Sequence, residues 1–176
     1  MIKDYKSMLG AKVLEFDSGQ LLAVVSGIIV NPDTGMVEAF WVKPATLFVR
    51  NAILKTSDIV EFKKNLYVKS DKVLAQAEDV IRINGILEEG RRFLGNSVQN
   101  EAGESYGRCT NLTFDSQTYA LKQIHAKKSI LGLITLDERI FSYDNILKVL
   151  PEMILVEDVA TKKETLMATT PEAAAG

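Results

Sequence analysis

The two residues best suited to catalysis are the single cysteine, Cys109, and the single histidine, His125. A thiol with an imidazole beside it could supply a nucleophile and its base, although a hydrolytic triad also needs an acid that orients the base. Buried cysteines more often behave as small apolar side chains. An internal repeat, described below, places Cys109 at the position of Val25 and His125 at that of Trp41, so neither has a chemical counterpart. We therefore expect no catalytic residue, and an enzyme that uses this pair stays an alternative.

Metal and cofactor sites are not indicated by the spacing of their usual residues. One cysteine and one histidine match no zinc motif. Asp33, Asp58 and Asp115 fall at expected turns or strand edges, where turn chemistry accounts for an aspartate. The chain has no P-loop, and no G-x-G-x-x-G run opens a helix. We expect no metal site and no cofactor.

Carboxylates do occur in pairs, at Glu88-Glu89, Asp137-Glu138 and Glu157-Asp158. The members of each pair are neighbours in sequence, so they point apart along a strand and diverge around a helix. General acid–base catalysis instead needs two groups that converge in a pocket. We interpret all three pairs as solvated surface charge.

Composition limits the class of protein and its setting. Apolar residues make up 47% of the 176 and charged residues 25%, enough apolar material for a packed core. The net charge of −2 gives no basic excess for nucleic acid. The N-terminus lacks the apolar core of a signal peptide, and no apolar run approaches the roughly 20 residues of a membrane helix. We expect a cytoplasmic protein without direct nucleic-acid contact or membrane insertion.

An internal repeat sets the organisation of the chain. Leu9-Gly10 returns as Leu94-Gly95, each followed by a valine three positions after the glycine. Ile28 is matched by Leu112, and Phe40 by Ile124, 84 positions later in both cases. The offset then becomes 87, which requires three inserted residues before Ile140. Identities are few, so the repeat is carried by apolar positions and turns.

Each repeat is expected to form short strands. In the first copy these are residues 12–16, 21–30 and 37–43, with weaker strands near 47–50, 58–62 and 66–68. The run Asn31-Pro32-Asp33-Thr34-Gly35 predicts a tight turn. We predict a first domain over residues 1–74, a helical linker over 75–90, a second domain over 91–158 and a disordered tail over 159–176. The linker would pack on a barrel through Val80, Ile83 and Leu87, which share one helical face.

The order of these signals resembles the PRC-barrel domain. It consists of Leu-Gly-x-x-Val, a turn ending in glycine, a second strand, an Asx/Gly turn and a third strand, and it occurs over residues 6–70 and 91–158. The second copy has paired glycines, Gly103 and Gly107, whereas the first has Gly19 and Ala23. The PRC-barrel is the small β-barrel of the photosynthetic reaction centre H subunit and of the ribosome maturation factor RimM. The resemblance implies a mainly β fold with two PRC-type β-barrels in tandem, joined by a short helix.

A candidate interface emerges where the two copies differ. Val24, Ile29 and Trp41 of the first copy are replaced by Arg108, Thr113 and His125 in the second. We therefore expect the first three to form an exposed apolar patch that joins the barrels, joins two chains or docks a partner. The alternative is that the first barrel closes differently and buries all three.

The function implied by the resemblance is that of a non-enzymatic adaptor, because known PRC-barrels mostly dock on other proteins and share no catalytic residues. The expected partner is a protein, or a second copy in a homo-oligomer. A ribosome-maturation or RNA-metabolism factor that acts through a ribosomal protein is the main alternative. Small-ligand binding between the barrels also stays open.

Overall fold

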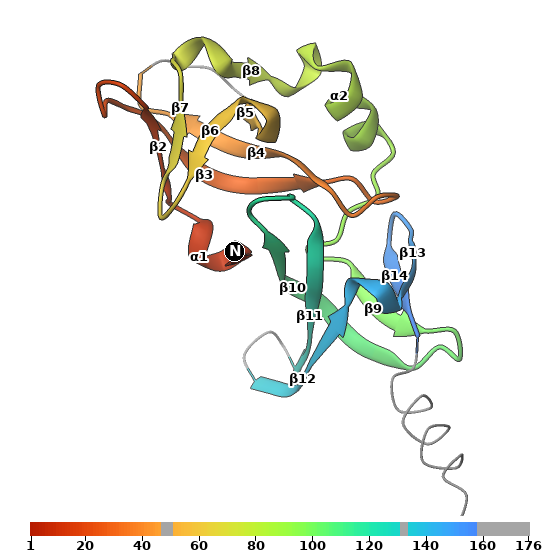
Figure 1. Cartoon of the computed structure of the whole chain (residues 1–176). Helices are drawn as coiled ribbons and strands as arrows, with labels where there is room; N and C mark the ends of the chain where they lie inside the picture. Colours follow the sequence, from red (N-terminus) through yellow and green to blue (C-terminus); the bar gives the residue numbers. More distant parts are fainter. Residues whose placement is uncertain (47–50, 131–133, 158–176) are drawn as a thin grey trace, which may run out of the picture.

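The fold is mainly β, with two curled sheets and short helices. The computed structural model describes residues 1–46, 51–130 and 134–157 (Figure 1). The predicted strand at 47–50 and the predicted disordered tail over 159–176 lie outside these residues. Neither α-helix in the described ranges has the length and apolarity to cross a bilayer.

The first sheet has seven strands in the order β6-β7-β2-β3-β4-β5-β8. All neighbours are antiparallel except β2 and β7, which are parallel. Their bounds are β2 (Lys12–Glu15), β3 (Leu21–Val30), β4 (Val37–Pro44), β5 (Ala52–Lys55), β6 (Ile59–Phe62), β7 (Leu66–Val68) and β8 (Leu74–Gln76).

The second sheet repeats this order as β12-β11-β10-β9-β14-β13, again with one parallel pair, β9 and β14. Its bounds are β9 (Ser97–Asn100), β10 (Ser105–Asp115), β11 (Leu121–Ile130), β12 (Ile134–Ser142), β13 (Ile146–Val149) and β14 (Met153–Val156). A short strand from the chain's start, β1 (Ile2–Asp4), also pairs with β10. The helix α1 (Tyr5–Met8) follows it, with Asp4 accepting a hydrogen bond from the Ser7 amide.

The strand pairing confirms the repeat. Ile28 pairs with Phe40, and Leu112 pairs with Ile124. Both hairpins also carry a bulge at equivalent positions, between Val25 and Gly27 in the first and between Cys109 and Asn111 in the second. Next, Trp41 pairs with Ile53, whereas His125 pairs with Ile140, which places the three inserted residues in the β11–β12 hairpin as predicted.

The predicted offset of 87 was wrong in the last strand, where it aligns Leu66 with Met153. Val13 pairs with Leu66, and the equivalent Val98 pairs with Ile154, so Leu66 corresponds to Ile154 and not to Met153. The turn between β13 and β14 is one residue longer than its counterpart, and a one-residue shift changes which side chains face the core. Ile154 is fully buried, as Leu66 is. The extra residue in the turn therefore keeps an apolar side chain at the buried position.

The repeated Leu-Gly pair has a conformational cause. Gly10 and Gly95 both have φ of +82°, a left-handed value that other residues avoid. The Gly10 amide donates to the Val25 carbonyl and the Gly95 amide to the Cys109 carbonyl, both at 2.8 Å. Glycine is therefore needed where the chain turns back to meet the second strand of its copy.

The larger of two apolar clusters in the described residues contains side chains of both sheets. Its junction is an aromatic cluster in which the rings of Phe40 and Phe62 from the first sheet meet that of Phe114 from the second, with centroids 6.0–6.3 Å apart. The ring of Tyr119 stacks on Phe62 at 6.5 Å. These rings join the two sheets through buried contacts.

Equivalent turns also meet at this junction. The Val37 amide donates to the Tyr119 carbonyl, and the Leu121 amide donates to the Gly35 carbonyl, both at 2.8 Å. Val37 is the repeat equivalent of Leu121, and Gly35 that of Tyr119, so each bond is the image of the other. Reciprocal contacts of this kind define a local two-fold axis.

The predicted linker over 75–90 begins inside β8, the last strand of the first sheet, continues as a 3₁₀ turn (Ala77–Asp79) and then forms helix α2 (Ile81–Glu88). Figure 1 shows α2 above the outer face of the first sheet. Ile83 and Ile86 are buried there, whereas Leu87 is 38% exposed. The predicted contact face was therefore wrong by one position, Ile86 replacing Leu87.

Candidate protein interface at Trp41

The position of Trp41 depends on the glycine opposite it. Trp41 pairs with Gly27 across β3 and β4. A β-carbon at residue 27 would lie 2.8 Å from Trp41 Cδ1 and 3.2 Å from Trp41 Cβ. The side chain of Trp41 therefore lies over the bare face of Gly27 and extends across β3. A glycine inside a strand often marks such a close approach.

Trp41 lines a hollow of about 320 Å³, which we name the Trp41 hollow. Its first wall is formed by Ile28, Ile29 and Val30 of β3. Successive side chains of a strand point to opposite faces, so a hollow that touches all three lies at the edge of that strand. The remaining wall comes from α2, the chain that follows it and β10: Ile86, Leu87, Gly90, Arg91, Arg92, Phe93, Leu94 and Leu112.

The predicted patch is only partly exposed, because the linker covers it. Ile29 is 3% exposed and belongs to a small apolar cluster that includes Ile53, Ile83 and Ile86. Trp41 is partly buried and packs against this cluster. The expected exposure of Ile29 was therefore wrong. Ile29 is covered by α2, which belongs to neither repeat and so has no equivalent in the second copy.

Val24 does not join the other two residues. It pairs with Lys12 on one side and Lys43 on the other, it is partly buried, and it does not line the Trp41 hollow. The bulge between Val25 and Gly27 separates it from Ile29. The structure thus brings Ile29 and Trp41 together and leaves Val24 elsewhere.

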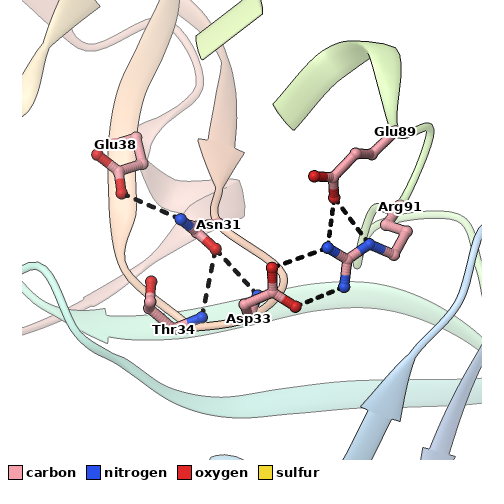
Figure 2. Close-up of polar contacts among 6 residues, drawn as sticks. All are labelled: Asn31, Asp33, Thr34, Glu38, Glu89 and Arg91. Atoms are coloured by element: carbon pink, nitrogen blue, oxygen red, sulfur yellow. Dashed lines mark hydrogen bonds and ion pairs between the residues drawn. The ribbon is translucent and has the colours of Figure 1, made fainter. Parts of the chain in front are cut away.

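Arg91 joins the linker to the turn between β3 and β4 by hydrogen bonds from its guanidinium (Figure 2). Arg91 donates from Nη1 to Asp33 Oδ1 at 2.6 Å and from Nη2 to Asp33 Oδ2 at 2.8 Å, and its Nε donates to Glu89 at 2.9 Å. Asn31 Oδ1 in turn accepts from the amides of Asp33 and Thr34. The hydrogen bond from Arg91 holds the pKa of the Asp33 carboxyl below its usual range. This bidentate ion pair holds Arg91, and with it one part of the lining of the hollow, in place.

The neighbouring arginine is placed differently. Arg92 is exposed and forms no ion pair with any residue in the described ranges. Leu87, which is 38% exposed, lines the same hollow. The mouth of the Trp41 hollow thus combines an exposed apolar side chain with a cation available to a partner. Gly27, Arg91 and Arg92 were not predicted from the sequence, although a glycine inside the second predicted strand was a usable signal. Leu87 was predicted to pack on a barrel and instead lines the mouth of the hollow.

The thiol of Cys109 is placed like a core side chain. Cys109 is 1% exposed, and its Sγ lies 3.5 Å from the Asn111 carbonyl, to which it donates. Burial raises the pKa of the thiol to about 12. The reactive thiolate is therefore strongly disfavoured near neutral pH.

His125 and the predicted turn aspartates have local partners. His125 Nδ1 lies 3.8 Å from Glu138, while its Nε2 has no hydrogen-bond partner among the described residues. Asp58 pairs with Lys55 at 3.2 Å. Asp115 accepts hydrogen bonds from the amides of Gln117 and Thr118, which lower the pKa of its carboxyl.

Over residues 1–46, 51–130 and 134–157, no group of three His, Cys, Asp or Glu residues could hold a metal ion. The comparisons add no relative from which a role could be transferred. No protein-family model matches the chain, and a search of curated proteins finds no match.

Proposed function

We propose that this protein is a non-enzymatic, protein-binding adaptor of the cytoplasm, built from two PRC-type barrels in tandem. The observation that carries the proposal is the Trp41 hollow, where an indole, an exposed leucine and an exposed guanidinium surround the edge of a strand. Tryptophan and arginine are the residues most enriched at the energetic centres of protein interfaces. A hollow of about 320 Å³ is at the lower limit for a small-molecule site, which favours a protein segment as its occupant.

The tandem-barrel arrangement has independent support. Apart from β8 and β1, the two sheets have the same strand order, an equivalent parallel pair and an equivalent bulged hairpin. Gly10 and Gly95 have the same backbone conformation, and each donates an equivalent hydrogen bond to the second strand of its own copy. Both belong to the Leu-Gly motif on which the resemblance to PRC-barrels depends. The raised pKa of the Cys109 thiol supports an adaptor over a thiol enzyme.

The adaptor role is tested by affinity purification of the tagged, full-length protein from the cells that make it. The test variant is Leu87→Glu, which places a charge at the mouth of the hollow. The matched control is Ile81→Glu on the same helix, since Ile81 is 90% exposed and does not line the hollow. A partner recovered by the wild type and the control, and lost from Leu87→Glu, is the expected result.

Mass spectrometry identifies the partner and separates a ribosomal protein from other classes. Recovery of no stoichiometric partner by the wild type would contradict the adaptor role. Equal recovery by all three proteins would contradict the assignment of the Trp41 hollow as the interface.

A further inference from the structure

One strand edge in this protein is occupied in the second sheet and open in the first. In the second sheet, β1 lies antiparallel to the end of β10, with Asp4 opposite Thr113 and Ile2 opposite Asp115. The Ser116 amide extends this pairing by donating to the Met1 carbonyl at 2.8 Å. The sheet thus accepts an extended segment on the part of β10 that β9 leaves uncovered.

The equivalent edge belongs to β3, where Ile29 and Asn31 correspond to Thr113 and Asp115. Pairing with β2 covers residues 21–24, and the amide and carbonyl of Val25 bond to Ala11 and Gly10. Beyond Val25, no strand in the described ranges pairs with this edge. The Trp41 hollow lies there instead.

We propose that the open edge of β3 receives an extended segment of a partner protein, which pairs through its backbone as an added antiparallel strand at the Trp41 hollow. This inference rests on the proposed adaptor function and specifies its mode of recognition. β1 shows, within the same chain, the geometry of such an addition. Strand addition is a general mode of peptide recognition in which backbone bonds give affinity and pockets for alternate side chains give specificity.

The lining of the hollow indicates the chemistry of the added strand. In the second sheet, Asn111 fills the position of Gly27 and bonds to Asp4 and to the Lys6 amide, so the occupant there is held by polar contacts. In the first sheet, the side chain of Trp41 takes that place over Gly27. An added strand would therefore find an apolar surface where β1 finds a carboxamide.

The side chains of the added strand face a largely apolar lining, which includes Trp41, Leu87, Phe93 and Leu112. The guanidinium of Arg92, which forms no ion pair with a described residue, favours a carboxylate beside the apolar run. The occupant is thus a short run of apolar residues, preferably β-branched, next to an aspartate or glutamate. Pairing of the added strand should end at the turn between β3 and β4. Pro32 there replaces Ser116, and proline has no backbone amide hydrogen to donate.

The experiment uses a displayed library of random heptapeptides, selected on the immobilised full-length protein. The strongest binder is synthesised and titrated while Trp41 emission is followed. Trp41 is the chain's single tryptophan, so the signal reports on the hollow. The expected result is a saturable shift with a Kd of about 1–100 µM.

Backbone pairing is tested by N-methylation of single peptide residues. Successive amides of a strand point to opposite sides, so methylation at alternate residues should weaken binding by about tenfold or more, and methylation between them should have little effect. Leu87→Glu should weaken binding by a similar factor, while Ile81→Glu should bind like the wild type. Circular dichroism checks that both variants fold.

The outcomes separate this inference from the adaptor function. Failure to select any peptide, or insensitivity to methylation at every position, overturns strand addition. The adaptor role stands in that case if Leu87→Glu still loses the purified partner. Concentration-dependent self-association that Leu87→Glu abolishes would identify a second copy as the occupant, and would overturn the assignment to a partner protein.

Discussion

At the scale of single residues, Gly27 and Trp41 act as one unit. The backbone of Gly27 is not left-handed, so alanine could adopt its conformation. The obstacle is the contact of 2.8 Å that an added β-carbon would make with Trp41 Cδ1. The missing side chain at Gly27 therefore determines where the indole of Trp41 lies.

Gly27→Ala should move the side chain of Trp41 and destabilise the protein by about 1–3 kcal/mol, the usual cost of overpacking. Chemical denaturation followed by circular dichroism measures the loss, and the Trp41 emission maximum reports the displacement. Gly85→Ala is the matched control, since a β-carbon there meets nothing within 4 Å. It should stabilise α2 by up to about 1 kcal/mol. An unchanged emission maximum in Gly27→Ala would contradict the coupling of the two residues.

Cys109 should react slowly in the folded protein. With its pKa raised to about 12 by burial, the thiol has little thiolate at pH 8. Alkylation by iodoacetamide should be at least about a hundredfold slower than in the unfolded chain. The variant Ser105→Cys, made in a Cys109→Ala background, supplies an exposed cysteine for comparison. Rapid alkylation of native Cys109 would instead favour the thiol-enzyme alternative.

At the scale of elements, the turn between β3 and β4 is held to the linker by a charged contact. Arg91 bonds to both oxygens of Asp33, a residue of the turn, and to Glu89 at the end of α2 (Figure 2). The linker therefore has a fixed position at the hollow, although its own helix is short. Removal of either partner should loosen one wall of the interface before it affects the sheets.

Asp33→Asn should lower stability at pH 7, and this loss should disappear in acid. Arg91 lowers the folded-state pKa of Asp33, so the carboxylate stabilises the fold above the unfolded-state pKa of about 4. That contribution is lost as the pH falls through the lower folded-state pKa. Thermal unfolding of both proteins between about pH 7 and pH 2 measures the difference. Asp17→Asn, at an exposed turn without an arginine partner among the described residues, is the matched control. A stability difference for Asp33→Asn that stays constant over this pH range would contradict the role of Arg91.

Long apolar strands bounded by turn residues were predictable, and contacts between elements were not. The strands predicted over 21–30 and 37–43 are confirmed as β3 and β4. Both are rich in apolar residues, and the turn over residues 31–35 separates them. The buried position of Ile29 could not be derived, since it depends on a linker that belongs to neither repeat. The error between Leu87 and Ile86 arose because a 3₁₀ turn precedes α2 and changes the helical phase assumed from Val80.

At the scale of the whole molecule, the two sheets share more than a covalent linker. Phe40 and Phe114 contact across the junction, and the reciprocal bonds of Val37 and Leu121 join the equivalent turns. The contact surface is therefore made of equivalent parts of both repeats, as in a two-fold dimer fused into one chain. A continuous core of this kind couples the stability of one sheet to that of the other.

The two sheets should consequently unfold in one transition. Trp41 emission follows the first sheet, and the accessibility of the Cys109 thiol follows the second. Coincident denaturation midpoints from the two probes indicate a single cooperative unit. Phe114→Ala removes a fully buried ring at the junction and should destabilise the protein by about 3–5 kcal/mol, lowering both midpoints together. Phe16→Ala, at a ring that is 49% exposed, should cost about 1 kcal/mol or less. If the Cys109 midpoint alone fell in Phe114→Ala, the sheets would be independent domains, and the shared aromatic core would not couple them.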